Sequence, residues 1–167
     1  VAAFIGSPPM NLVEARVESG TVSFGGFTVS VPSDLDLSAY VGGSVVLGIR
    51  PSDLEDANVW RNDALPKLDV SAEVTEDLGS EVNVLFSIDA PPVRTEDTIA
   101  ASEDADEDVI PLMVDEGRAI LCARVDARTD ARPGKNVRLS VDPARFHYFD
   151  KDTGARLTPS SSALAPA

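Results

Sequence analysis

The most constraining feature of this chain is a series of short, valine-rich runs that alternate apolar and polar residues and end at proline or glycine. In residues 41–54, for example, Val45, Leu47 and Ile49 fall at every second position, and Pro51 ends the run. A period of two is that of a strand with one face in a core, and proline ends the ladder because it lacks an N–H donor. With 12 prolines and 11 glycines in 167 residues, this pattern predicts an all-β fold.

Arg50 stands at the end of that run, directly before Pro51. Proline restricts the preceding residue to extended conformations, so Arg50 is expected where the strand leaves the sheet, with a guanidinium that can reach across a boundary. The residues after it, Ser52 to Leu54, are expected to form a turn. We interpret Arg50 as a structural or interface cation at the corner of a barrel.

Two hairpins are predicted. The pair Gly25-Gly26 separates two alternating runs and predicts a two-residue turn. The alternating runs 68–74 and 82–88 flank a short loop and predict a second hairpin. Two further strands are expected at 118–125 and 136–141.

Turn signals spaced by roughly ten residues are typical of small OB-type barrels, which have few open edges. We therefore expect OB-like barrels built from short antiparallel strands in residues 1–155. The acidic stretch 95–115 is expected as a solvated loop, and residues 156–167 as a flexible tail.

The net charge of −14 argues against nucleic acid as a partner, because 28 acidic and only 14 basic side chains repel phosphate backbones. An OB fold that binds single strands also needs a basic groove lined with aromatic residues. A single cysteine, Cys122, precludes an intrachain disulfide and favours a reducing compartment. The chain begins at Val1 rather than Met, which favours a fragment of a longer protein.

No catalytic or metal-binding motif is complete. The only Gly-Lys pair, Gly134-Lys135, has Thr129 where a P-loop needs its first glycine and Asn136 where it needs a hydroxyl. We therefore expect no nucleotide hydrolysis by this chain. Catalytic, cofactor-binding and metal-binding residues are all predicted to be absent.

Two partial patterns have a simpler interpretation. Asp104, Asp106 and Asp108 have the spacing of a Ca²⁺ loop, but the glycine and the final glutamate are missing. Cys122 lies in an apolar strand and is expected as a small core residue, and His147 lies between aromatic residues. One cysteine and one histidine do not suffice for an ordinary zinc site.

Three motifs resemble a known family: FIGSPPMN at residues 4–11, LGIRP at 47–51 and EDLGSE at 76–81. In this order and spacing they are similar to the C-terminal part of the ATP-binding subunits of carbohydrate ABC importers, of the maltose and multiple-sugar type. The resemblance covers about residues 1 to 155. It implies a regulatory domain of OB-like barrels, called TOBE, with the nucleotide site upstream.

The resemblance also implies partners and a location. The complete subunit is a homodimer that binds ATP and Mg²⁺ and sits on the cytoplasmic face of two integral-membrane permease subunits. In the maltose type, a regulatory protein also contacts this domain. The stretch 95–115 is longer and more acidic here than in that type, and the partner-binding positions are not identical, which leaves a regulatory protein open.

Candidate contact residues follow from the resemblance alone. Those for a regulatory protein fall near Leu12, Gly42, Val46, Gly48 and Glu76, the dimer side falls near Ser140 and Phe149, and Arg50 is the interface cation. The alternative for each is structural, with the glycines setting turn or strand geometry and the apolar residues filling the core. A second functional hypothesis is an oxyanion sensor, with N–H groups supplied by Gly6-Ser7 and Gly42-Gly43-Ser44.

Overall fold

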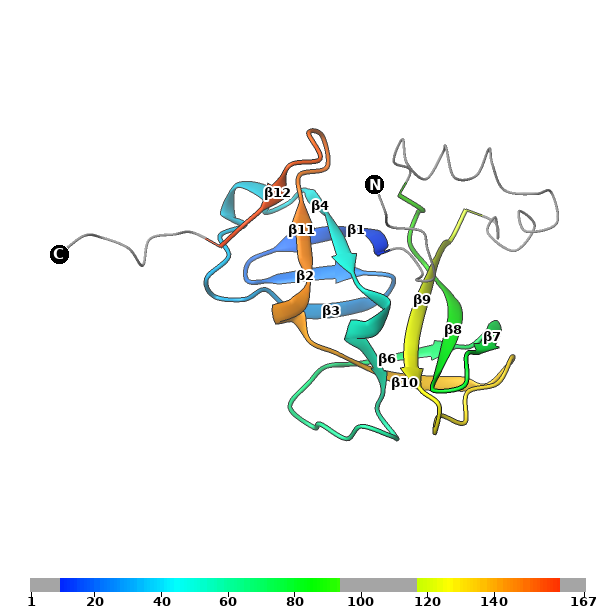
Figure 1. Ribbon diagram of the computed structural model, residues 1–167. Helices are drawn as coiled ribbons and strands as arrows, with labels where there is room; N and C mark the ends of the chain where they lie inside the picture. Colours follow the sequence, from blue (N-terminus) through cyan, green and yellow to red (C-terminus); the bar gives the residue numbers. More distant parts are fainter. Residues whose placement is uncertain (1–9, 94–116, 160–167) are drawn as a thin grey trace.

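The prediction of an all-β chain is confirmed by a computed structural model, which describes residues 10–93 and 117–159 and arranges short antiparallel strands in three sheets (Figure 1). In chain order the strands are β1 (Asn11–Glu18), β2 (Thr21–Phe24), β3 (Phe27–Ser30), β4 (Ser44–Ile49), β5 (Leu54–Asp56), β6 (Lys67–Ser71), β7 (Val74–Asp77), β8 (Glu81–Ile88), β9 (Ala119–Asp126), β10 (Asn136–Val141), β11 (His147–Phe149) and β12 (Arg156–Leu157). The 3-10 helices of these residues are η1 (Ser38–Tyr40), η2 (Pro51–Asp53) and η4 (Pro143–Arg145).

Sheet A holds both ends of the described chain. Its strand order is β12-β11-β4-β1-β2-β3. The alternation seen in the sequence places Val45, Leu47 and Ile49 in the core, each at most 1% exposed. The predicted turn between β2 and β3 is confirmed, because Gly25 and Gly26 have φ angles of 54° and 85°, which two-residue hairpins require.

The strands β5 to β10 form a second unit, inserted between β4 and β11. Sheet B has the order β5-β10-β6, and sheet C has the order β7-β8-β9. After this insertion the chain returns to sheet A, where β11 pairs with β4 and His147 lies opposite Gly48. Residues far apart in the sequence thus complete one sheet.

The predicted hairpin of 68–74 with 82–88 is wrong in one respect. Residues 68–74 do not form one strand, because they are divided between β6 and β7. β6 pairs with β10, whereas only β7 pairs with β8. The chain changes sheets at Ala72 and Glu73, whose N–H groups donate to Lys135 and to Leu85 respectively. A period-two pattern cannot show this change, because the alternation continues through it. At the C-terminal end, β12 pairs with β11, so Arg156 and Leu157 of the expected tail extend sheet A.

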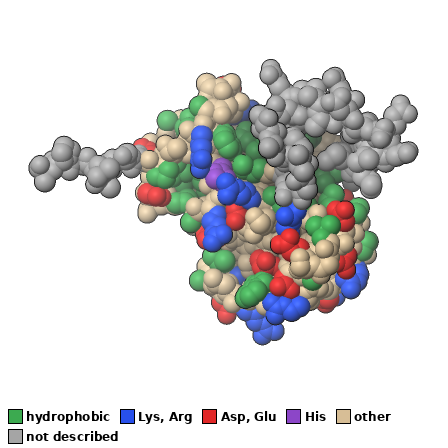
Figure 2. All heavy atoms as spheres, viewed as in Figure 1, with side chains coloured by type: hydrophobic (Ala, Val, Ile, Leu, Met, Phe, Trp, Pro, Cys, Tyr) green, Lys and Arg blue, Asp and Glu red, His purple; other side chains and the backbone are tan. Residues whose placement is uncertain are grey.

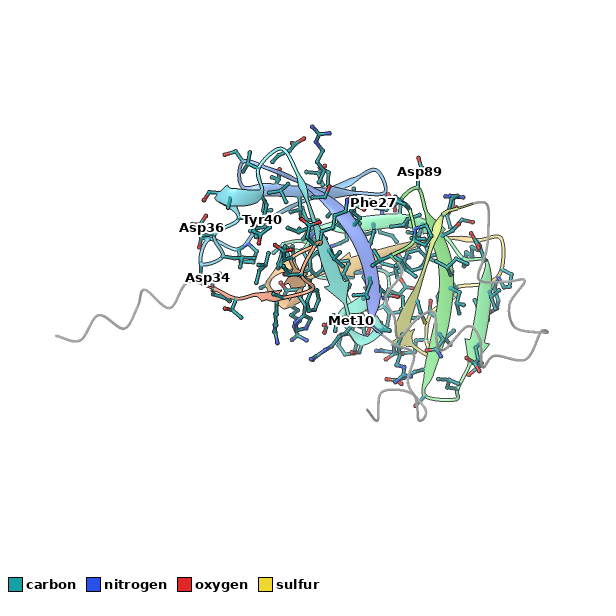
Figure 3. All side chains as sticks on the ribbon, turned by 90° about the horizontal axis from the view of Figure 1, so that it is seen from above. Met10, Phe27, Asp34, Asp36, Tyr40 and Asp89 are labelled. Carbon is teal, nitrogen blue, oxygen red and sulfur yellow. The ribbon has the colours of Figure 1, made fainter. Side chains whose placement is uncertain are left out.

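The two units are joined by a polar contact and by close packing. The buried Asn11 amide donates to the Cys122 carbonyl at 2.8 Å and accepts from the Cys122 N–H at 2.7 Å. A Cβ at Gly25 would lie 2.9 Å from Ile88, so the β2–β3 turn packs tightly on the end of β8. Figure 3 shows this proximity at Phe27 and Asp89.

Cys122 is not the core residue that the sequence predicted. It is half-buried, and the core positions of β9 are its immediate neighbours Leu121 and Ala123. Alternation along β9 turns Cys122 to the opposite face. Burial raises the pKa of its thiol to about 11, so the thiolate needed for nucleophilic chemistry is scarce at neutral pH.

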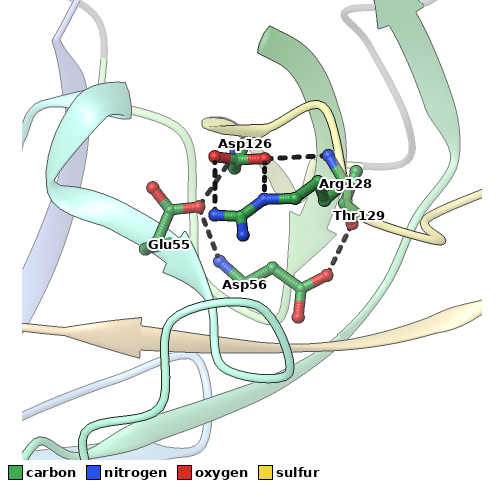
Figure 4. Close-up of polar contacts among 5 residues, drawn as sticks. All are labelled: Glu55, Asp56, Asp126, Arg128 and Thr129. Atoms are coloured by element: carbon green, nitrogen blue, oxygen red, sulfur yellow. Dashed lines mark hydrogen bonds and ion pairs between the residues drawn. The ribbon is translucent and has the colours of Figure 1, made fainter. Parts of the chain in front are cut away.

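A polar network holds β5 against the β9–β10 connection (Figure 4). The Thr129 hydroxyl donates to the Asp56 carboxylate at 2.5 Å, and both residues are buried. The Glu55 carboxylate accepts the N–H groups of Asp56 and Asp126 at 3.1 and 3.0 Å, and Arg128 donates to Asp126 through two nitrogens. Because β5 directly follows η2, this network fixes where the chain leaves sheet A after Arg50.

Replacing Thr129 by Val should destabilise the fold, because the near-isosteric change leaves one oxygen of the buried Asp56 carboxylate without its donor, while the other still accepts from the Asn58 N–H. The expected loss is about 1–3 kcal/mol, measured by urea unfolding. Thr28→Val is the matched control, since its hydroxyl pairs with Ser23 on the surface, and we expect a change within about 0.5 kcal/mol. Equal stability of the two variants would contradict the network's role.

Candidate functional site

Several of the candidate residues come together on the side of sheet A that faces away from the core. In the register of the sheet, Leu12 lies opposite Gly48, and Val46 lies opposite Phe149. Directly paired residues project from the same face of a sheet. We call the set Met10, Leu12, Val46, Gly48 and Phe149 the outer face of sheet A.

The outer face is apolar, and most of its side chains are partly exposed to solvent. Its residues Leu12, Val46 and Phe149 are of intermediate exposure, as is Met10, which precedes β1 (Figure 3). An ion pair borders it, because Lys151 donates to Glu14 at 2.8 Å. This contact lowers the pKa of Glu14 and keeps the carboxylate charged. An apolar patch with a charged border is typical of a protein contact surface.

Gly48 serves packing within this face. It is buried, and a Cβ there would lie 2.3 Å from the Met10 Sδ and 3.0 Å from a ring carbon of Phe149. The glycine therefore lets the side chains of Met10 and Phe149 lie flat over β4. Gly48 thus determines how the neighbouring side chains form the surface, although it is itself buried and cannot contact a partner.

A cationic region adjoins the outer face where β4 ends. Arg50 is exposed there, as expected, at the start of η2. Arg156 approaches His147 at 2.9 Å, between its Nη2 and the Nδ1 of the ring. Figure 2 shows Lys and Arg side chains gathered around the histidine, and His147 is the only one in the chain.

The charges around His147 determine its protonation. Burial and the guanidinium groups of Arg156 and Arg50 lower its pKa, while Asp53 acts in the opposite direction. The imidazole is therefore neutral at pH 7, with Nδ1 accepting from Arg156 and the proton on Nε2. A neutral ring in this position is a hydrogen-bond donor toward its surroundings.

The other candidate residues lie elsewhere. Gly42 is in the exposed turn before β4, with a φ of 86°. Glu76 is exposed on β7 and accepts a hydrogen bond from Asn83 at 3.2 Å. Ser140 is 4% exposed and lies in β10 of sheet B, whereas Phe149, with which the resemblance had grouped it, lies in β11 of sheet A.

The turn at Gly42-Gly43 does not offer the N–H groups that an oxyanion site would need. The N–H of Gly42 donates to Val17 at 3.0 Å, and that of Gly43 donates to Tyr40 at 2.8 Å. Both donors are thus committed to the fold. The second group suggested by the sequence, Gly6-Ser7, lies outside the described residues.

The described residues contain no group of three or more His, Cys, Asp or Glu side chains placed to hold a metal ion. The aspartates 104, 106 and 108 lie outside this part of the chain. Cys122 on β9 and His147 on β11 belong to different sheets and form no catalytic pair. Within residues 10–93 and 117–159, no helix is long and apolar enough to span a membrane.

His147 and Arg156 are the residues that sequence reasoning missed as part of this region. Their place depends on the pairing of β11 with β4 and of β12 with β11. No local signal predicts that register, since the paired strands are separated by the whole inserted unit. The lone histidine next to aromatic residues was the only available hint.

Comparison with known proteins confirms the resemblance. Residues 6–54 match the MalK OB fold domain family. The chain is 28% identical to the oligosaccharides import ATP-binding protein MsmX of Bacillus subtilis, over 94% of this chain and 37% of the relative. It is 33% identical to the trehalose/maltose import ATP-binding protein MalK of Thermococcus litoralis, over 92% of this chain and 36% of the relative.

A third relative is the trehalose import ATP-binding protein SugC of Mycobacterium tuberculosis, which is 30% identical over 95% of this chain and 40% of the relative. The chain therefore spans well under half the length of these curated relatives. Its similarity is to the OB-fold region of ATP-binding subunits of sugar importers, in agreement with the three motifs.

The change Gly48→Ala should both destabilise the chain and displace Met10 and Phe149, because the new methyl group occupies their space. We expect a loss of about 1–3 kcal/mol in urea unfolding. Gly43→Ala is the control, since its Cβ would meet only the Tyr40 carbonyl, at 3.3 Å. If both variants lose the same stability, the packing role assigned to Gly48 is wrong.

His147 should titrate below the ordinary histidine value of about 6.5 in an NMR pH titration, which a single histidine makes unambiguous. Because the unfolded state then binds more protons, stability should fall as the pH drops through about 6.5. Arg156→Gln removes one nearby cation and should raise the pKa of His147, whereas Arg138→Gln on β10 should not. A wild-type pKa at or above 6.5 would contradict this arrangement.

Proposed function

We propose, from its similarity to sugar-import ATP-binding proteins, that this chain is the noncatalytic regulatory and dimerisation domain of the ATP-binding subunit of a sugar ABC import system. In the complete subunit, ATP and Mg²⁺ bind outside this chain. That subunit works on the cytoplasmic side of the membrane, at the inner face of the plasma membrane, with integral-membrane permease subunits. The chain's own role is to make protein contacts.

The observation that carries the proposal is the outer face of sheet A. It brings together Leu12, Val46 and Phe149, which the family resemblance had already suggested as contact residues, and leaves them partly exposed. Burying such apolar surface in a partner contributes about 25 cal/mol per Å². In residues 10–93 and 117–159, the titratable groups form hydrogen bonds and ion pairs but no nucleophile–base pair, which supports binding over catalysis.

The local charge distribution makes this face the part of the described surface where a second copy of the chain meets little repulsion. Two chains that each carry −14 repel one another, so they associate most easily where acidic side chains are few or paired. The outer face meets that condition, since Glu14 is paired with Lys151, and Arg50 and Arg156 lie nearby. A two-fold axis through the face makes it an isologous interface.

The dimer proposal predicts reversible, concentration-dependent association of this chain in sedimentation velocity. Val46→Asp places a charge in the centre of the outer face and should raise the dimer dissociation constant at least tenfold. Val74→Asp, at a half-buried position of β7, is the matched control and should leave it unchanged. Monomers at all concentrations, or equal effects of the two variants, would contradict the dimerisation role.

The noncatalytic role predicts that purified chain does not hydrolyse ATP above the level of a buffer blank. The reason is that no glycine-rich loop with the required lysine and hydroxyl residues is present in the sequence. A phosphate-release assay with Mg²⁺ and millimolar ATP measures this directly. Turnover that follows the protein through purification would contradict the proposal.

A further inference from the structure

A cavity of about 450 Å³ lies next to the outer face, between the end of β3, the helices η2 and η4, and the strands β11 and β12. Its polar lining includes Arg50, Arg145, Arg156, His147 and Tyr148. The volume falls within the range of small-molecule sites, about 300–1,000 Å³. Cationic side chains from three separate segments, Arg50, Arg145 and Arg156, thus converge on one hollow of a strongly acidic chain.

Two of these arginines have no ion-pair partner among the described residues. Arg145 is neutralised by Asp53 at 3.3 Å and by Asp142 at 3.8 Å. For Arg50 and Arg156, no carboxylate lies within 4 Å in the described part of the chain. The remaining carboxylate of the lining, Asp34, is exposed.

Tyr148 is a further polar group that lines the cavity without a partner. Its side chain is 3% exposed, and its buried hydroxyl makes no hydrogen bond among the described residues. Burial raises the pKa of Tyr148 to about 12, so the hydroxyl keeps its proton.

We propose that this cavity binds the phosphoryl group of a small phosphorylated organic compound. The guanidinium groups of Arg50 and Arg156 bind its oxygens, and the Nε2–H of His147 supplies a further donor. Planar guanidinium forks match the geometry of phosphoryl oxygens. The ligand's organic body packs on the apolar part of the lining, which includes Leu35, Phe146 and Leu157.

Charge and size distinguish this ligand from simpler anions. A phosphate monoester carries about −1.5 to −2 at pH 7, which balances two unpaired guanidinium groups. A single carboxylate would leave one of them unbalanced. Inorganic phosphate alone would leave the apolar wall uncovered. This inference is independent of the proposed dimerisation, since the cavity belongs to one copy of the chain.

The test is isothermal titration calorimetry of this chain with phenyl phosphate, inorganic phosphate and phenol at constant ionic strength and pH 7.5. We expect saturable binding of phenyl phosphate, at least tenfold weaker binding of inorganic phosphate, and no binding of phenol. NMR shift changes should centre on His147 and Tyr148.

Variants locate the site. Arg50→Gln and Arg156→Gln change exposed side chains, so the fold should persist by circular dichroism, and each should weaken phenyl phosphate binding at least tenfold. Arg138→Gln is the control, because its guanidinium pairs with Asp69 on sheet B at 2.7 Å. The proposal is overturned by absence of saturable binding, by equal affinity for inorganic phosphate, or by Arg156→Gln behaving like Arg138→Gln.

Discussion

The pairing of β11 with β4 is the contact on which the rest of this structure depends. It joins residues 147–149 to residues 46–48 after an inserted unit of two further sheets. Without it, Phe149 would not lie over Gly48, and sheet A would end at β4. Closing so long a loop costs conformational entropy. The burial in the core of Leu47 and of Tyr148, which lies opposite it on β11, offsets that cost.

Both functional proposals depend on the position that this pairing gives to β11. On the outer side, β11 completes an apolar surface with Leu12 and Val46. The first two residues of β11, His147 and Tyr148, line the cavity together with Arg50 and Arg156. A surface for another protein and a hollow for a small anion therefore share a strand.

Local patterns were sufficient for much of the fold and little of the site. The alternation in β1, β4 and β8 and the Gly25-Gly26 turn follow from period and backbone freedom, which are properties of neighbouring residues. The change of sheet at Ala72 and the convergence of Arg156 on His147 depend on pairing between distant strands. The family resemblance suggested Leu12, Val46 and Phe149 as contact residues. Cys122 was misplaced because alternation does not reveal which face is the core.

The central claim, that the outer face of sheet A is the contact surface of this domain, is tested most directly by cysteine protection. In a Cys122→Ser background, single cysteines at Val46 and at Val74 are alkylated at protein concentrations below and above the association midpoint. The account predicts that alkylation at position 46 slows at least fivefold on association while position 74 is unaffected. Unchanged reactivity at position 46, or protection at position 74 instead, would contradict it.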